Sequence, residues 1–300
     1  MRNKNTIVVL TTSNENLYNE KFFEPIGPNN EMLLEYTIFD AIEAGFKRII
    51  LVVPDHIGNS IKNNVHDKFK KHAQIHWVGI KPMSLLSLTR RIPYHLFSFN
   101  SYALWKVKHL IKGPFLVVNG RFFHGKNTYR EALNFLSLDN RDLVVLNCPL
   151  RMTLSPYGGV NRGICITEKE SDSLKRIVEV KKVRKHKLGI DHEDRNLMDI
   201  SEEMLATTGV YCLHKDYFRS YRAFLKSSKM GYSNDKNKAT IPSLINYSLR
   251  EKICNARAVT IESNWFSINF KPERVLAISK IREMIIRQEY PEKLHYLRTR

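Results

Sequence analysis

The chain has 300 residues, 43% of them hydrophobic, which is enough apolar material for one large α/β domain or two modest ones. No apolar run approaches the roughly 18 residues that a bilayer-spanning helix needs, and Met1–Asn5 leads into a short strand without the apolar region and cleavage site of a secretory signal. A cytoplasmic protein is therefore expected. The four cysteines form no CxxC pair, which favours buried free thiols over zinc binding or disulfides.

The formal net charge of +18 is the most unusual bulk property. Residues 1–150 carry +7, residues 151–300 carry +11, and the densest basic run is Lys181–Lys187. A solvated, lysine-rich surface explains such a charge. A surface that binds a polyanion, such as RNA or the ribosome, or an acidic protein, explains it equally well. Both interpretations stay open.

The first elements form one strand–helix–strand unit. Residues 6–10 are an apolar, β-branched run typical of a buried parallel strand, and residues 49–53 form a second one. Between them, a loop rich in Pro, Gly and Asn precedes a helix that begins near Met32, where apolar residues recur at steps of three and four. Gly45 is placed to end this helix, because glycine tolerates the left-handed cap conformation. Asp40 is interpreted as a solvated residue of the helix.

The alternation of strand and helix continues to about residue 147. Hydrophobic periodicity predicts a surface helix within 54–75, a strand at 74–78, a helix at 97–111, a strand at 115–119, a helix at 127–137 and a strand at 143–146. Such alternation is typical of a doubly wound parallel sheet.

Beyond residue 147 the apolar runs are more typical of antiparallel strands. The predicted elements are strands at 163–167, 174–180 and 207–213, helices at 216–225 and 241–249, a strand at 257–261 and a final helix at 273–287. The basic run, together with Asp191–Asp194, is predicted to be a mobile excursion. We find no internal repeat and no low-complexity linker, which favours one continuous α/β fold.

A family resemblance runs over nearly the whole chain. Residues Pro25–Phe46 match, almost position for position, the segment PVGPNGETLLDYSIYDAIRAGF of nucleotidyltransferases in the sugar-nucleotide pyrophosphorylase superfamily. Five later segments resemble the family in the same order: 113–119, 158–163, 178–179, 241–244 and 264–266. The resemblance implies an α/β fold with a mostly parallel, doubly wound sheet, glycosyltransferase-A-like and Rossmann-like, and an antiparallel C-terminal extension.

The same resemblance implies a single domain over residues 1–290. Its nucleotide-binding-like half is 1–147 and its sugar-binding-like half is 148–290, and a basic C-terminal tail follows at 291–300.

The family's reaction is attack of a sugar phosphate on the α-phosphate of a nucleoside triphosphate. It needs glycines that let backbone N–H groups approach the triphosphate, and carboxylates that hold magnesium. The loop that should resemble LAAGxGSRYGGLK has no glycine at residues 10–21 and keeps only Lys21. Where the family has NADDFYG, this chain has Asn119–Gly125, so Arg121 stands where the metal carboxylate is expected. The glycines of a GTGHA pattern near the base are replaced at residues 99–103.

The resemblance therefore gives two candidate catalytic residues, Lys21 and Arg121, and no metal ligand. The candidate binding residues are Gly27, Asn119, Glu179, Lys182 and Thr208. The first hypothesis is a nucleotidyltransferase-like protein that is impaired in metal-dependent synthesis of sugar nucleotides, retains nucleotide or sugar-phosphate binding, and has no cofactor. One alternative is a non-catalytic basic protein that binds RNA, the ribosome or another large assembly. The other is an active enzyme with a rearranged site, which alone would need Mg²⁺.

Overall fold

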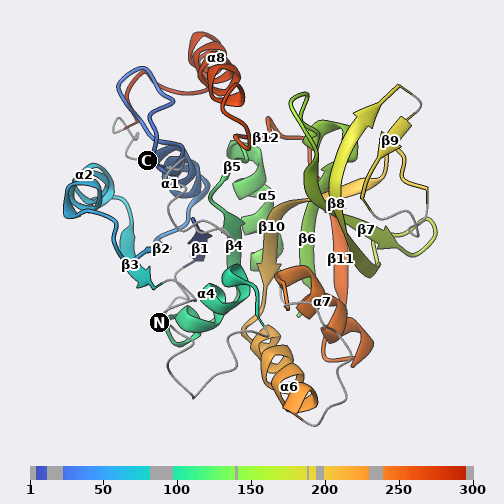
Figure 1. Cartoon of the computed structure of the whole chain (residues 1–300). Coiled ribbons are helices and arrows are strands. Elements are labelled where there is room, and N and C mark those ends of the chain that lie inside the picture. The colour runs from blue at the N-terminus through green and yellow to red at the C-terminus, as the bar shows by residue number, and fades with distance from the viewer. Residues whose placement is uncertain are drawn as a thin grey trace.

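A mixed ten-stranded sheet runs through the centre of the described part of the molecule (Figure 1). The computed structural model describes residues 5–11, 23–81, 97–138, 141–187, 189–193, 199–229 and 239–294. One half of the sheet consists of four parallel strands in the order β3-β2-β1-β4. Their bounds are β1 Thr6–Leu10, β2 Arg48–Pro54, β3 Gln74–Ile80 and β4 Phe115–Asn119.

An antiparallel strand divides this half from two further parallel strands. β10 (Leu205–Leu213) lies antiparallel to β4, and β6 (Leu143–Pro149) lies antiparallel to β10. β11 (Ala256–Thr260) is parallel to β6. β6 and β11 therefore run in the same direction as β4, and all their carboxyl ends lie at one edge of the sheet. The mostly parallel sheet confirms the predicted fold class, although β10 enters its centre and β11 returns to the parallel direction.

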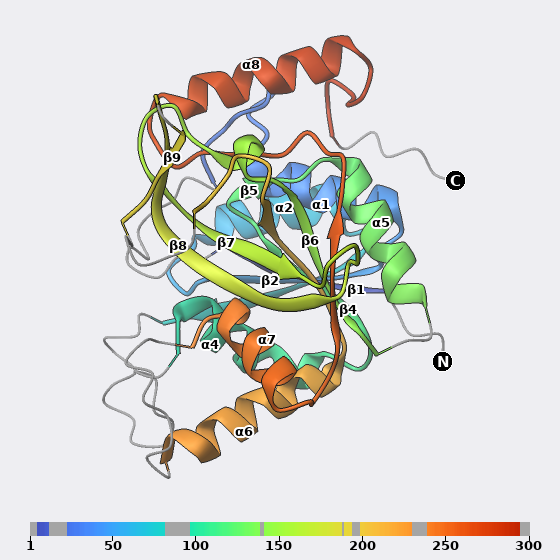
Figure 2. The same cartoon turned by 90° about the vertical axis from the view of Figure 1, so that its right-hand side faces the viewer.

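The basic run lies in a β-hairpin, so the prediction of a mobile excursion over this stretch was wrong. β7 (Val160–Thr167) pairs antiparallel with the long, curved β8 (Leu174–His186), which pairs with β9 (Gly189–Asp191) (Figure 2). Val180 and Val183 are buried and anchor the strand. The prediction failed because the run of charges hides this apolar spacing. Asp194, the last residue of the predicted excursion, lies outside the described residues.

Helices cover both faces of the sheet, as Figure 2 shows. The core on one face includes residues of α1 (Leu33–Ala44), α2 (Asn59–Phe69), α5 (Lys126–Ser137) and α8 (Glu273–Ile286). The core on the other includes residues of α4 (Phe99–Val107), α6 (Phe218–Lys229) and α7 (Ile241–Arg250). Within β1, Ile7 and Val9 face the first core while Val8 and Leu10 face the second. This two-sided burial explains the continuous apolar run.

Three short 3₁₀ helices and one small ribbon complete the described chain. The 3₁₀ helices are η3 Lys108–Leu110, η4 Leu150–Thr153 and η5 Lys215–Tyr217. β5 (Phe122–Phe123) pairs with β12 (Phe266–Ser267) in the ribbon. No described helix is long and apolar enough to cross a bilayer. All four cysteines are free thiols, and Cys148, Cys165 and Cys212 are buried as expected.

Helix α1 begins and ends as its sequence predicts, but Asp40 is not solvated. Gly45 adopts φ +109° and closes the helix. Asp40 is 1% exposed, and the hydroxyl of Tyr290 donates to its two carboxylate oxygens at 2.9 and 2.8 Å. The interpretation of Asp40 as a solvated residue was therefore wrong. The residue that shields it and bonds to it is Tyr290, which lies 250 residues later in the chain. Local periodicity cannot predict so distant a contact.

The first residues of the predicted basic tail, like Tyr290, pack on the α1 face of the sheet. Leu294 is buried in the core on the α1 face, and the backbone oxygen of Glu292 accepts a hydrogen bond from Asn29 Nδ2 at 2.6 Å. The start of the tail, up to residue 294, is thus packed against the domain. Residues 295–300 lie outside the described residues.

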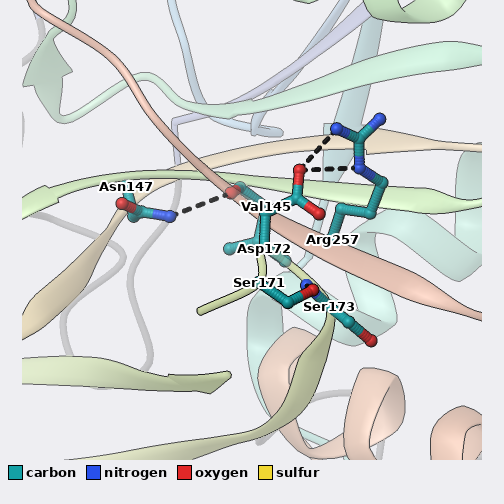
Figure 3. A network of polar contacts seen from close by, with 6 residues as sticks. All are labelled: Val145, Asn147, Ser171, Asp172, Ser173 and Arg257. Atoms are coloured by element: carbon teal, nitrogen blue, oxygen red, sulfur yellow. Dashed lines mark hydrogen bonds and ion pairs between the residues drawn. The ribbon is translucent and has the colours of Figure 1, made fainter. Parts of the chain in front are cut away.

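An ion pair ties the β7–β8 turn to β11 (Figure 3). Arg257 Nε donates to Asp172 Oδ2 at 2.9 Å, and Arg257 Nη2 donates to the same oxygen. The backbone oxygen of Asp172 also accepts from the N–H of Ala258 at 2.7 Å. These contacts fix the antiparallel branch against the parallel part of the sheet.

Candidate functional site

The chain crosses the carboxyl edge of the sheet immediately after β4. A Cβ at Gly120 would lie 2.9 Å from Cγ1 of Val9, so only glycine allows this close passage over β1. The β5–β12 ribbon then pairs Phe122 with Ser267 and Phe123 with Phe266. Since ligands of open α/β sheets bind outside the carboxyl ends of the strands, this edge is the candidate site.

Polar contacts hold the turn after β4 in shape. Asn119 Oδ1 accepts the backbone N–H of Arg121 at 3.1 Å, and Nε2 of His124 bonds to the backbone oxygen of Asn119 at 3.0 Å. Burial lowers the pKa of His124 to about 4, so its ring is neutral at neutral pH. Asn119 and His124 therefore act as supports of the turn that carries Arg121.

Two guanidinium groups lie near each other at this edge. Burial lowers the pKa of Arg121. Burial also lowers the pKa of Arg162 to about 10, and repulsion from Arg121 acts in the same direction. Arg162 is 7% exposed, donates to the backbone oxygens of Thr153 and Asn161, and lies over the ring of Trp265, with its Cζ 5.3 Å from the ring centroid. The edge is thus electropositive.

A bulge in β10, next to Thr208, brings Gly209 against Asn119. The register of β10 against β6 shifts between Thr207 and Val210, and Gly209 adopts φ +81°. A Cβ at Gly209 would lie 3.0 Å from Cβ of Asn119, so the two strands touch here. The hydroxyl of Thr208 is buried and donates to the backbone oxygen of Leu146 at 2.8 Å. This bond occupies the donor of the Thr208 side chain.

A cavity of about 780 Å³ opens at the carboxyl ends of β6 and β11. Such a volume is within the range of small-molecule sites. Its wall includes Trp265, Tyr290 and the first turn of α5, whose N-terminal backbone groups favour anions. Its charged lining residues are Lys126, Arg130, Arg151, Glu262 and Glu289. The cavity can therefore hold a small anionic molecule close to Arg162, since Trp265 both lines the cavity and contacts Arg162.

The other candidate binding residues take up structural contacts. Glu179 Oε2 accepts the hydroxyl of Thr240 at 2.6 Å, which places its charge at the N-terminus of α7. Lys182 Nζ donates to Glu193 Oε1 at 3.1 Å on the exposed hairpin. Gly27 lies in the turn before α1, where an added Cβ would be 2.6 Å from the Tyr36 hydroxyl. The structure thus places Asn119 and Arg121 in one turn and Thr208 in the neighbouring bulge of β10, whereas Gly27, Glu179 and Lys182 have separate local contacts.

Lys21 and the glycine-free loop from residue 12 onward lie outside the described residues. At the end of β4, Asn119, Gly120 and Arg121 offer an amide and a guanidinium where magnesium would need carboxylates, so they do not fit this metal. Across the described ranges, no three His, Cys, Asp or Glu side chains group as metal ligands.

Arg162 and Trp265 belong to the site but were not predicted as site residues. Both occur in segments that were recognised only as scaffold, 158–163 and 264–266. One sequence feature could have pointed to Arg162: it is a charged residue directly before the apolar centre of a strand, Gly163–Ile166 in β7. A buried arginine needs partners, and those partners come from distant segments of the chain.

No protein-family model and no curated protein matches the sequence. Several solved structures match its fold. The inositol-1-phosphate CTP transferase from T. maritima has a TM-score of 0.58 and 15% identity, over 93% of this chain and 96% of that chain. UTP-bound UGPase from Acinetobacter baumannii has a TM-score of 0.58 and 12% identity, over 97% and 95%. A Bacillus anthracis protein assigned as a glucose-1-phosphate thymidylyltransferase, in complex with sucrose, has a TM-score of 0.63 and 10% identity, over 93% and 95%.

Identities this low establish the architecture alone. The neighbours nevertheless agree with one another, and each covers nearly the whole chain. The resemblance drawn from the sequence is therefore confirmed at the level of the fold: this chain has the fold of the sugar-nucleotide nucleotidyltransferases.

Proposed function

We propose that the protein binds a nucleotide or a sugar phosphate at the carboxyl edge of its sheet and does not carry out metal-dependent nucleotidyl transfer. The observation that carries this proposal is the pair of guanidinium groups of Arg121 and Arg162 beside the end of β4. A guanidinium presents its N–H donors in a planar fork that suits phosphate oxygens. Arg121 would thus neutralise a phosphate directly, at the point where the family resemblance leads us to expect a metal carboxylate.

Two further observations support ligand binding. The cavity of about 780 Å³ offers room for a nucleotide or sugar phosphate beside Trp265, whose ring contacts Arg162. Among the structures with the same fold, one is a UGPase bound to UTP and another is a UDP-glucose pyrophosphorylase complexed with UDP-glucose. A protein that kept this architecture and lost the metal carboxylate would retain recognition without the reaction.

The loss of catalysis is tested by incubating the protein with each nucleoside triphosphate, a sugar 1-phosphate and Mg²⁺, and measuring pyrophosphate release. We expect no release above the protein-free blank. Arg121→Asp alone should not restore it, because residues 10–21 still contain no glycine to admit the triphosphate. Turnover by the wild-type protein that disappears in Lys21→Ala would contradict the proposal, and turnover gained by Arg121→Asp would show that the loop is not the barrier.

Binding is tested by calorimetry with UTP and with glucose 1-phosphate, in EDTA and in Mg²⁺. We expect similar affinities in both buffers and a loss of at least about tenfold in Arg121→Gln, since a charge-assisted bond is removed. The matched control is Arg250→Gln, because Arg250 is an exposed cation paired with Glu251 at the end of α7. Binding that requires Mg²⁺, or that both variants weaken equally, would rule out a direct phosphate contact by Arg121.

A further inference from the structure

A second concentration of positive charge lies on the outer side of α4, η3 and α6. Lys106 of α4 and Arg222 of α6 lie close enough to Lys108 to lower its pKa, and with the exposed Lys112, Lys215, Arg219 and Lys226 of the same segments they form what we call the α4–α6 surface. Within residues 99–112 and 215–227, Asp216 is the one acidic residue. Arg219, Arg222 and Lys226 follow one another at steps of three and four, so they form a stripe on one side of α6.

Aromatic packing joins the two helices into one surface. The ring of Trp105 stacks on Tyr221 with centroids 5.2 Å apart and meets Phe218 edge-on at 6.3 Å. The hydroxyl of Tyr221 donates to the backbone oxygen of Ser101 at 2.9 Å. α4 and α6 lie at one end of the molecule, whereas β5 and α8 lie at the other (Figures 1 and 2). The surface is therefore separate from the candidate site.

The charges of this surface are not neutralised in the same way as those of the hairpin. On the hairpin, Lys182 pairs with Glu193, Arg184 with Asp191, and Lys185 with Glu202. On the α4–α6 surface, the described residues offer one carboxylate, that of Asp216, which lies 3.8 Å from Arg219 and is shared with Arg141 and His214. No described carboxylate pairs with Lys106, Lys112, Arg222 or Lys226.

The cations of the α4–α6 surface repel one another. Lys108 is half-buried, with its Nζ 3.9 Å from the centroid of the Trp105 ring. The pKa of Lys108 is lowered, first by burial and then by repulsion from Arg222 and Lys106. Clustered like charges destabilise the folded protein slightly, and a polyanion bound across them would remove that repulsion.

We propose that the α4–α6 surface binds the phosphate backbone of a nucleic acid, without reading its sequence. Phosphates along one strand of a duplex recur about every 3.4 Å of axis, and cations three to four residues apart on a helix recur about every 5 Å, so successive cations of the stripe can each reach a phosphate. The described exposed large apolar side chains are Leu138, Met152, Tyr157, Val275, Leu276 and Ile286, and none belongs to α4 or α6. A surface that inserts into a lipid bilayer would need such side chains, so the structure favours a nucleic acid over a membrane.

The test compares two triple variants, each of which removes three positive charges from a different surface. One is Arg219→Gln/Arg222→Gln/Lys226→Gln on the α4–α6 surface. The other is Lys182→Gln/Arg184→Gln/Lys185→Gln on the hairpin. Binding is measured by fluorescence anisotropy with an RNA duplex of about 20 base pairs and the DNA duplex of the same sequence, across a salt series. Thermal melts confirm that both variants are folded.

For the wild-type protein, about six phosphate contacts predict a slope of roughly −5 in the logarithm of affinity against the logarithm of salt concentration. The α6 triple should weaken binding by roughly 100-fold at low salt and make the slope shallower by about 3. The hairpin triple should change affinity by less than about threefold, because its cations are already paired. Equal binding of RNA and DNA supports backbone recognition, and a preference for one identifies the natural partner.

Three results would overturn the proposal. The first is equal weakening by both triples, which would mean that net charge alone drives association. The second is binding that does not respond to salt. The third is binding to phosphatidylserine vesicles that depends on the α6 cations while neither duplex binds, which would assign the surface to a membrane.

Discussion

The two faces of the central sheet differ in whether their ionisable groups lie inside the fold or on its surface. On the face covered by α1, α2 and α5, ionisable groups lie inside: Asp40 and Glu35 are 1% and 0% exposed. Each has a partner from a distant segment, Tyr290 and Lys68 respectively. On the face covered by α4 and α6, the interior is aromatic, with Phe97, Trp105 and Tyr221 in contact, while the cations point outward.

This difference shows that the net charge of the chain does not reveal which charged groups affect stability and which are available to bind a partner. A buried carboxylate is stable only with a partner, because leaving it unpaired in a low-dielectric interior is strongly unfavourable. An exposed lysine contributes little to stability and remains available to a partner molecule. Substitutions on the α1 face should therefore alter stability, whereas matched substitutions on the α4–α6 face should alter binding.

The largest expected effect is on the pH dependence of stability in Asp40→Asn. Burial is the main cause that raises the pKa of Asp40 from 3.8 to about 8; the Tyr290 hydrogen bond, Lys126 and Arg130 oppose it, and Glu43 adds to it. Between these two pH values the folded state holds a proton that the unfolded state has lost. Stability from this group therefore falls as pH rises from about 4 to about 8, by a total on the order of 5 kcal/mol.

Because asparagine does not titrate, Asp40→Asn should not lose stability as pH rises from about 4 to about 8. The difference in stability between Asp40→Asn and the wild type should therefore shift in favour of the variant across this pH range. Urea denaturation at several pH values measures the difference. The matched control is Asp67→Asn on the exposed side of α2, since the pKa of Asp67 is lowered by its hydrogen bond to Lys70 and not raised. Parallel stability curves for Asp40→Asn and the wild type would show that Asp40 stays ionised in the fold.

Next in size is the loss of stability in Lys68→Met. Lys68 Nζ lies 2.5 Å from Oε1 of Glu35, whose side chain is fully buried. Glu35 Oε2 also accepts the backbone N–H of Met32 at 2.7 Å. Removing Lys68 leaves the buried carboxylate without its counter-charge, which should cost about 3 kcal/mol. Chemical denaturation measures this cost.

Two companion variants test the cause. Lys226→Met on α6 should change stability by less than about 0.5 kcal/mol, because Lys226 is exposed. Adding Glu35→Gln to Lys68→Met should recover part of the loss, since the amide is neutral and can still accept from Met32. If Lys226→Met were as destabilising as Lys68→Met, the two faces would not differ in the way that we infer.

Much of this architecture could be predicted from local pattern, and the site could not. The run at residues 6–10 and the periodicity from Met32 to Gly45 depend on neighbours a few residues apart, and both elements formed as predicted. Asp40 and Arg162 were missed because their partners, Tyr290 and the backbone of Thr153, are set by tertiary packing. Arg121 was identified through a family resemblance, since its own local sequence is that of a turn after a strand.

The smallest expected effects come from two Tyr→Phe substitutions, one on each face. Tyr290 donates to both oxygens of the buried Asp40, whereas Tyr221 donates to the backbone oxygen of Ser101 at 2.9 Å. Tyr221→Phe should cost about 1 kcal/mol, the net value of a neutral hydrogen bond, and Tyr290→Phe about 2 kcal/mol, because it leaves a buried carboxyl group under-satisfied.

The two substitutions also differ in how their cost in stability responds to pH. Without Tyr290 the pKa of Asp40 should rise further, so the penalty of Tyr290→Phe should grow at high pH, while that of Tyr221→Phe should stay constant. Denaturation of both variants below and above about pH 8 tests this, and equal, pH-independent penalties would mean that the two faces hold their buried tyrosines by the same kind of bond.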